Sequence, residues 1–205
     1  MELHDLDLAP VEHVYPVRED SLLLASRAVV HPDELVLEVG CGRGLAALCA
    51  ARAGARVLAS DLNPFALRSV QRESQARGLG ISLILTDLFD GLGRFDGVLF
   101  NPPYLPSTPA PEGEDAWERL ALDGGPRGSE LSQRWLDALP SHLTGSGRGY
   151  LLRLEGLEGR PQAPLHAPEG LVARRVGDPR RLEGETLSVW EVRRGNRGSA
   201  ATRTF

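Results

Sequence analysis

The chain has 205 residues, of which 41% are hydrophobic and 25% charged, and its formal net charge is −5. This length allows one sizeable α/β domain and hardly two, and the acidic balance argues against non-specific binding to nucleic acid. The sequence contains neither a run of about eighteen apolar residues nor a basic-then-apolar leader, so it predicts a cytoplasmic protein that does not span a membrane.

Four short apolar or β-branched runs predict the first half of the fold. They cover residues 35–39, 56–60, 81–85 and 96–100. Because helix-length segments separate these runs, they are typical of parallel strands joined by helical crossovers. A helix is expected directly after Gly44. A second helix should begin at Asn63-Pro64, an N-cap followed by proline, and Gly78 should end it at about Arg77.

The second half begins with a stretch dense in proline, glycine and acidic residues. This stretch, residues 105–128, is interpreted as a long loop, and such loops in compact domains usually have a function. A helix is expected from about Ser129 to Leu143. Three further strands are expected at residues 149–154, 171–176 and 186–192. The basic tail, residues 195–205, has no apolar pattern and is expected to be disordered, which leaves residues 1–194 as one domain.

The first predicted strand runs into a glycine-rich turn. Gly40, Gly42 and Gly44 would let the backbone approach a ligand and would begin the next helix with free N–H groups. Ligands of open α/β sheets bind outside the carboxyl ends of the strands. Asp61, at the end of the second strand, is therefore expected to accept hydrogen bonds from ribose hydroxyls. An N-cap role in the following helix is the alternative for Asp61.

An acid at this distance also occurs in dinucleotide-binding folds, so NAD has to be considered. The glycine order here is G-x-G-x-G, which differs from the dinucleotide fingerprint, and Glu38 would repel a pyrophosphate while suiting the ammonium group of a methionine moiety. The pattern therefore favours S-adenosylmethionine. Asp87, after the third strand, is expected to accept from the adenine amino group beside the Leu88 backbone, and a simple loop role is its alternative.

The apolar run that ends at Phe100 leads into Asn101-Pro102-Pro103-Tyr104. A planar amide or exocyclic adenine nitrogen is a poor nucleophile because its lone pair is delocalised. If Asn101 Oδ1 and the Pro102 carbonyl accept its two hydrogens, the nitrogen is oriented for attack on a methyl group. Tyr104 would cover the planar group. The loop therefore predicts methyl transfer to nitrogen, with a stiff turn as the alternative.

No metal is expected, because Cys41 and Cys49 lack further ligands and the five histidines are scattered. The sequence also contains no lysine, so no lysine can act as a base or nucleophile.

With these residues in place, the chain resembles the HemK/PrmC-like class I methyltransferases, which methylate the glutamine of the Gly-Gly-Gln loop in release factors. It is similar to their short eukaryotic and archaeal branch. The resemblance rests on six segments, namely Val14-Tyr-Pro-Val-Arg-Glu-Asp-Ser21, Asp61-Leu-Asn-Pro-Phe-Ala66, Thr86-Asp87-Leu88, Asn101-Pro-Pro-Tyr104, Asp123-Gly124-Gly125 with Gly128, and Gly184-Glu-Thr-Leu-Ser188. The glycine- and proline-rich residues after the fifth strand depart from the family, in which a helix follows.

The resemblance implies a Rossmann-like α/β domain whose seven-stranded, mostly parallel sheet has an antiparallel last strand. It also implies that Asp20 and Ser21 approach the methionine end of the cofactor. The nearly all-apolar edge strand 81–85 predicts a small partner protein that adds a strand there, as the activator does in the family's short branch. Burial of this strand under the crossover helices is the alternative. Protein glutamine N5 is the first substrate hypothesis. The alternatives are an N6-adenine or other RNA or DNA nitrogen methyltransferase, and a non-catalytic scaffold that binds the cofactor without turnover.

Overall fold

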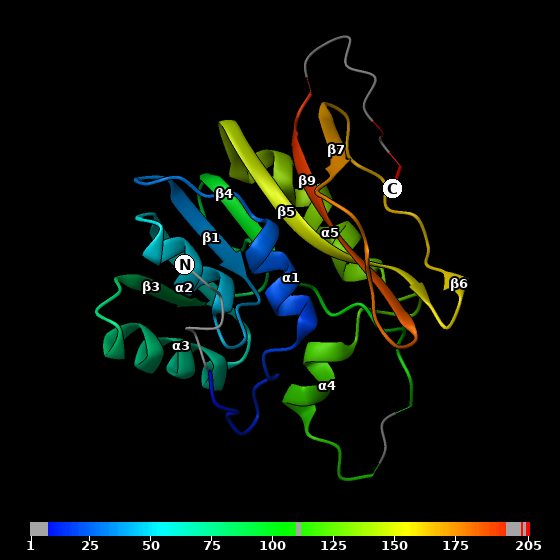
Figure 1. The fold of residues 1–205 in the computed structure, drawn as a ribbon, viewed down its shortest axis with the longest axis horizontal. Coiled ribbons are helices and arrows are strands. Elements are labelled where there is room, and N and C mark those ends of the chain that lie inside the picture. Colours follow the sequence, from blue (N-terminus) through cyan, green and yellow to red (C-terminus); the bar gives the residue numbers. More distant parts are fainter. Residues whose placement is uncertain (1–7, 110–111, 196–201, 203) are drawn as a thin grey trace.

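The computed structural model describes residues 8–109, 112–195, 202 and 204–205. Its main strands are β1 (Leu35–Val39), β2 (Arg56–Asp61), β3 (Ile81–Leu85), β4 (Phe95–Phe100), β5 (Leu143–Leu157), β7 (Leu171–Arg175) and β9 (Glu185–Arg194). They form one sheet in the order β3-β2-β1-β4-β5-β9-β7 (Figure 1). The predicted seven-stranded α/β sheet is thus confirmed. Two unpredicted two-residue strands extend it, β6 (Arg160–Pro161) beside β5 and β8 (Arg180–Arg181) beside β9.

The first five main strands are parallel, and β9 pairs antiparallel with both β5 and β7. Central strands of a parallel sheet are covered on both faces and therefore need apolar residues throughout. Both β1 and β4 meet this requirement, with nearly every residue buried. β3 is the edge strand, as predicted, and is only partly buried. β5 is much longer than the predicted 149–154, because it begins directly at the end of the preceding helix.

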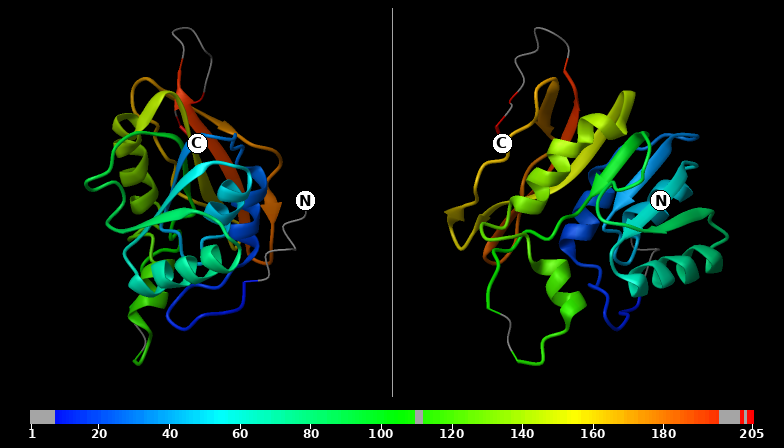
Figure 2. Two further views of the ribbon diagram at one scale, coloured as in Figure 1. Left: turned by 90° about the vertical axis from the view of Figure 1, so that its left-hand side faces the viewer. Right: turned by 180° about the vertical axis from the view of Figure 1, so that it is seen from behind.

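Helices cover both faces of the sheet. α1 (Glu19–Arg27), α2 (Leu45–Arg52) and α3 (Pro64–Ala76) contribute to the core on one face. α5 (Glu130–His142) packs Trp135, Leu136 and Leu139 into the core on the other face, which Figure 2 shows from behind. The caps of α3 follow the prediction, since Asn63 Oδ1 accepts a hydrogen bond from Phe65 N at 2.9 Å and Pro64 is the first helical residue. No helix in the described part of the chain is long and apolar enough to cross a membrane.

The prediction of a continuous loop over 105–128 is wrong for one segment. Residues Ala116–Leu122 form the short helix α4, which lies apart from the sheet (Figure 1). Asp115 caps this helix by accepting a hydrogen bond from Trp117 N at 2.7 Å. None of the residues of α4 is buried. The helix is too short to show an apolar period, and the flanking prolines and glycines indicate a loop, so the pattern could not reveal it.

The prediction of a disordered tail is wrong for its described residues, because Gly195 N donates to Gly170 O at 2.9 Å, Thr202 O accepts from Ala173 N at 3.3 Å, and the last residue is buried. Phe205 is only 7% exposed, and its ring centroid lies 4.6 Å from that of Trp190. Its backbone exchanges hydrogen bonds with Leu165 in both directions, at 2.7 and 3.1 Å. One aromatic residue at the end of a polar segment produces no periodic pattern, which is why the sequence did not indicate this packing. Residues 196–201 and 203 of the tail lie outside the described residues.

Candidate active site

One cavity of about 410 Å³ opens at the carboxyl ends of β1, β2 and β4. Its wall contains every residue that the sequence singled out for cofactor binding or transfer, namely Ser21, Glu38, Gly40, Gly42, Asp61, Asp87, Leu88, Asn101, Pro102 and Tyr104. A volume of this size is typical of sites for cofactors and small ligands. The structure therefore brings the two predicted halves of the site together in one space.

The glycine-rich turn between β1 and α2 is held in a left-handed conformation. Gly44 has φ 71°, and a Cβ atom added there would lie 2.6 Å from Val70 Cγ2 of α3. Only glycine fits such a position without strain and collision. The turn therefore packs closely against α3, and its residues line the cavity.

Asp61 ties the glycine turn to the turn that follows β2. Its Oδ2 accepts a hydrogen bond from Gly42 N and its Oδ1 accepts one from Asn63 N, each at 2.8 Å. Burial raises the pKa of Asp61, while these amide contacts act in the opposite direction. The N-cap of α3 is Asn63, two residues after Asp61. Asp61 therefore does not have the N-cap role that was its alternative.

Glu38 is buried at the end of β1, with an exposed fraction of 6%. Its Oε2 accepts a hydrogen bond from Ala47 N at 2.7 Å, so the carboxyl group satisfies a free amide at the start of α2. Burial raises the pKa of Glu38 to about 8 despite this contact. The sequence predicted Glu38 as a wall of the cofactor site and missed its contact with α2.

Asp87 has a partner that the sequence did not reveal. Its Oδ2 pairs with Arg134 Nη2 of α5 at 2.9 Å, and both side chains are partly exposed. The following residue, Leu88, has φ 47°, a left-handed conformation that is uncommon for leucine. Asp87 therefore lies at the edge of the cavity. Its ion pair links the loop after β3 to α5, which covers the sheet face that α1, α2 and α3 leave free.

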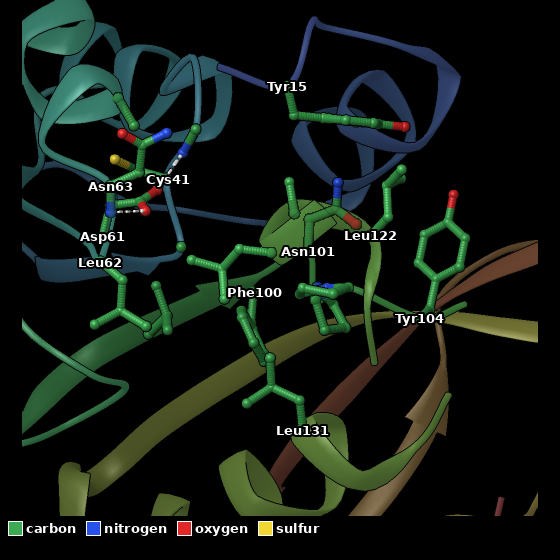
Figure 3. A pocket seen from close by; sticks show the side chains of 18 of the residues that line it. Tyr15, Cys41, Asp61, Leu62, Asn63, Phe100, Asn101, Tyr104, Leu122 and Leu131 are labelled. Atoms are coloured by element: carbon green, nitrogen blue, oxygen red, sulfur yellow. Dashed lines mark hydrogen bonds between the residues drawn. The ribbon is translucent and has the colours of Figure 1, made fainter. Parts of the chain in front are cut away.

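Asn101 points its side chain into the cavity between Tyr15 and Tyr104 (Figure 3). Its Nδ2 donates a hydrogen bond to Asp20 Oδ2 at 3.1 Å. Its Oδ1 is buried, and no group in the described residues donates to it. A buried acceptor without a partner is costly. This atom is therefore placed to receive a hydrogen from a ligand.

The loop that carries Asn101 is supported by a second glycine-rich segment. Leu105 N donates to Leu122 O at 3.1 Å, and Gly124 N donates to Leu105 O at 2.9 Å. A Cβ atom at Gly124 would lie 2.7 Å from Pro103 O, and one at Gly128 would collide with Tyr104 O. The sequence segment Asp123-Gly124-Gly125 thus allows the backbone to pack directly against the Asn-Pro-Pro-Tyr loop.

The N-terminal arm and α4 meet beside the cavity. His13 Nδ1 pairs with Asp115 Oδ2, the carboxylate that caps α4, and this contact raises the pKa of His13. The His13 ring lies 4.9 Å from the ring of Phe65, which in turn lies 6.3 Å from Trp117. Both Tyr15 of the arm and Trp117 of α4 line the cavity. These two segments therefore form one wall, which the sequence did not indicate.

Comparison with known proteins agrees with this geometry. A family model described as the methyltransferase small domain matches residues 17–119. Over 155 residues, the chain is 36% identical to a Methanocaldococcus jannaschii protein named as a putative protein N5-glutamine methyltransferase, covering 75% of this chain and 78% of that one. It is 32% identical over 155 residues to the Mus musculus methyltransferase HEMK2, covering 69% and 72% of the two chains. A Geobacter sulfurreducens release factor glutamine methyltransferase is 30% identical over 156 residues, with 71% and 55% covered.

Solved structures show the same fold at low sequence identity. A Pyrococcus furiosus methyltransferase superposes with a TM-score of 0.62 and 16% identity, covering 92% of this chain and 89% of that one. A T. thermophilus 16S rRNA methyltransferase, in complex with AdoMet and guanosine, has a TM-score of 0.55 and 19% identity, with 86% and 43% covered.

Proposed function

The chain belongs to the methyltransferase small domain family, and from this premise we propose that it transfers a methyl group from S-adenosylmethionine to the side-chain nitrogen of a protein glutamine. The proposed target is N5 of the glutamine in a release factor Gly-Gly-Gln loop. The relative named as a protein N5-glutamine methyltransferase and the relative named as a release factor glutamine methyltransferase support this substrate. A cytoplasmic location is part of the same proposal.

The single observation that carries the proposal is the unpartnered Oδ1 of Asn101. A glutamine side chain ends in an NH2 group, which is the donor that such an acceptor lacks. If Asn101 Oδ1 and the Pro102 carbonyl each accept one hydrogen, the plane of the amide is fixed at the cavity. The nitrogen is then held in one orientation, and correct positioning can lower a barrier by roughly 7–11 kcal/mol in favourable cases.

The cavity also fits the proposed cofactor. Asp61 retains acceptor capacity for ribose hydroxyls beside the glycine turn. The buried Glu38 carboxyl group would lose its proton when a cationic methionine moiety binds beside it, and would then supply the negative charge that pairs with this moiety. The left-handed glycine turn leaves backbone close to this space. S-adenosylmethionine supplies an activated methyl group on a positively charged sulfur.

Tyr104 covers the acceptor side of the site and does not act as a base. Burial, followed by the charge of Asp20, raises the pKa of Tyr104 far above its ordinary value, so the phenol stays protonated at physiological pH. Asn101 and Pro102 offer only acceptors of hydrogen bonds. The nitrogen therefore loses its proton to water after methyl transfer, and no protein base is required.

The proposal is tested with purified protein, tritiated S-adenosylmethionine and three acceptors offered in parallel. The acceptors are a release factor, the same factor with its Gly-Gly-Gln glutamine replaced, and total RNA. Label is expected in the first acceptor alone. Label in RNA alone would show that the protein is a nucleic-acid methyltransferase. Cofactor binding without label in any acceptor would indicate a scaffold or a missing partner.

Replacing Asp61 by alanine is expected to weaken cofactor binding more than it lowers kcat at saturating cofactor. The loss of charge-assisted hydrogen bonds should reduce the binding free energy by roughly 1–3 kcal/mol, measured by calorimetry. Because Asp61 also holds Gly42 N and Asn63 N, Asp61→Asn serves as a second variant that keeps one acceptor. Asp90→Ala, in an exposed turn, is the control. Unchanged affinity in Asp61→Ala would contradict the assignment.

We further propose that a small partner protein adds a strand to β3. This strand ends the sheet, and its last residue, Leu85, is 58% exposed. An exposed apolar edge is usually protected by a partner. The wild-type protein alone is therefore expected to self-associate as its concentration rises, and Leu85→Asp is expected to abolish this in analytical ultracentrifugation. Val29→Asp, at another exposed apolar position, is the control. A wild-type protein that stays monomeric and fully active alone would refute the partner.

A further inference from the structure

We propose that Asp20 is a positioning residue, which fixes the side-chain amide of Asn101 with its oxygen toward the cavity. The inference rests on the proposed function, because it explains how the acceptor for the substrate NH2 group is oriented. It concerns a contact between the first turn of α1 and the end of β4, 81 residues apart in the chain.

An asparagine side chain can occupy the same space with its amide in either of two orientations. The two ends of the amide have nearly the same shape, but one donates hydrogen bonds and the other accepts them. If Nδ2 pointed into the cavity, Asn101 would present hydrogens to the hydrogens of a substrate amide. An asparagine that turns freely would therefore spend part of its time in a form that repels the substrate.

Asp20 permits only one of these two orientations of Asn101. An ionised carboxylate can only accept hydrogen bonds, so the group that faces it has to be Nδ2, and the 3.1 Å distance between Asn101 Nδ2 and Asp20 Oδ2 agrees with this. The opposite orientation would place Oδ1 against a negative charge in a buried site, where Asp20 is only 3% exposed. The amide oxygen is left buried without a donor among the described residues, on a residue that lines the cavity.

The carboxylate of Asp20 is itself held in place. Its Oδ1 accepts hydrogen bonds from Ser21 N at 2.6 Å and from Ser21 Oγ at 3.2 Å. Both residues lie in the first turn of α1, where the helix dipole stabilises negative charge. One oxygen is therefore committed to Ser21, and the other is available for Asn101.

This division predicts the effect of the isosteric change Asp20→Asn. The new side chain has only one acceptor, which Ser21 N and Ser21 Oγ claim, so its NH2 group faces Asn101. Asn101 should then turn its own oxygen toward residue 20 and its NH2 group toward the cavity. We expect kcat to fall by roughly 10²-fold, the effect of losing one preorganised contact to a transition state. Because the resemblance also places Asp20 near the methionine end of the cofactor, kcat is measured at saturating S-adenosylmethionine.

The orientation can be observed without any substrate. The chain contains three asparagines, Asn63, Asn101 and Asn196, so protein labelled with 15N-asparagine gives few side-chain signals, and Asn101→Ala identifies those of Asn101. In the wild type, one Asn101 hydrogen should be shifted downfield and exchange slowly with water. Asp20→Asn should abolish both properties. Glu19→Gln, an exposed neighbour in the same helical turn, should leave the signals and kcat unchanged.

Three results would overturn the inference. They are an Asn101 amide that exchanges rapidly in the wild type, a kcat in Asp20→Asn within about twofold of the wild type, or a loss of cofactor affinity with kcat unchanged at saturation. The first is measured on the wild type and stands even if the variant fails to fold. Failure of the proposed function is distinct, because it would show as a wild type that methylates no glutamine while its Asn101 signals remain as predicted.

Discussion

Asn101→Ala is expected to reduce methyl transfer to glutamine by roughly 10³-fold or more, while S-adenosylmethionine still binds within severalfold of its normal affinity. The change removes a buried acceptor in the cavity that lacks a partner among the described residues, and with it the contact that orients the acceptor nitrogen. Loss of a single preorganised hydrogen bond to a transition state lowers rates by about 10²–10³-fold. Loss of orientation adds to this effect.

The measurement separates binding from catalysis. Cofactor affinity is obtained by calorimetry, and single-turnover transfer is followed with tritiated cofactor at saturation, because a mutation that acts only in the transition state lowers kcat without changing the binding of the cofactor. Asn63→Ala provides the control for losing an asparagine near the same cavity, since Asn63 caps α3 and lines the cavity away from the transfer loop. Full transfer activity in Asn101→Ala would show that the proposed role of the loop is wrong.

The sequence contained enough information to predict the sheet and the position of the site. The runs that form β1 and β4 are apolar because both of their faces are buried, and the residues after them project from the same edge of the sheet. The pattern of strands alone was therefore sufficient to place the glycine turn and the Asn-Pro-Pro-Tyr loop together. Asn63 and Pro64 also defined the start of α3, because capping depends on neighbouring residues alone.

What the sequence could not reveal are contacts between distant segments. The pairs Asp20–Asn101, His13–Asp115 and Asp87–Arg134 join residues far apart in the chain, and neither partner stands in a pattern that identifies the other. The same reason explains the packing of Phe205, since one aromatic residue has no period. The contact of Glu38 with α2 was missed because an acid at the end of a strand equally fits a role toward a ligand.

Glu38→Gln is expected to change how stability depends on pH. Burial raises the pKa of Glu38 from 4.5 to about 8, so between these values the folded protein holds a proton that the unfolded chain has released. Stability from this group is therefore fully present below about pH 4.5 and is lost as pH rises toward 8 and beyond. Glutamine carries no titrating proton at this position and can still accept from Ala47 N. Between pH 5 and pH 9 the wild type should lose roughly 2–5 kcal/mol of unfolding free energy relative to the variant.

Urea unfolding of both proteins across this pH range measures the difference, with Glu19→Gln as the control for removing an exposed carboxylate. The same ionisation should appear in cofactor binding. A cationic ligand in the cavity favours the charged carboxylate, so binding should release a proton below about pH 8, and wild-type affinity should rise with pH up to that point. Glu38→Gln should bind more weakly, with no such rise. Two unfolding curves that stay parallel from pH 5 to pH 9 would mean that Glu38 is ionised throughout, and that the amides of α2 outweigh its burial.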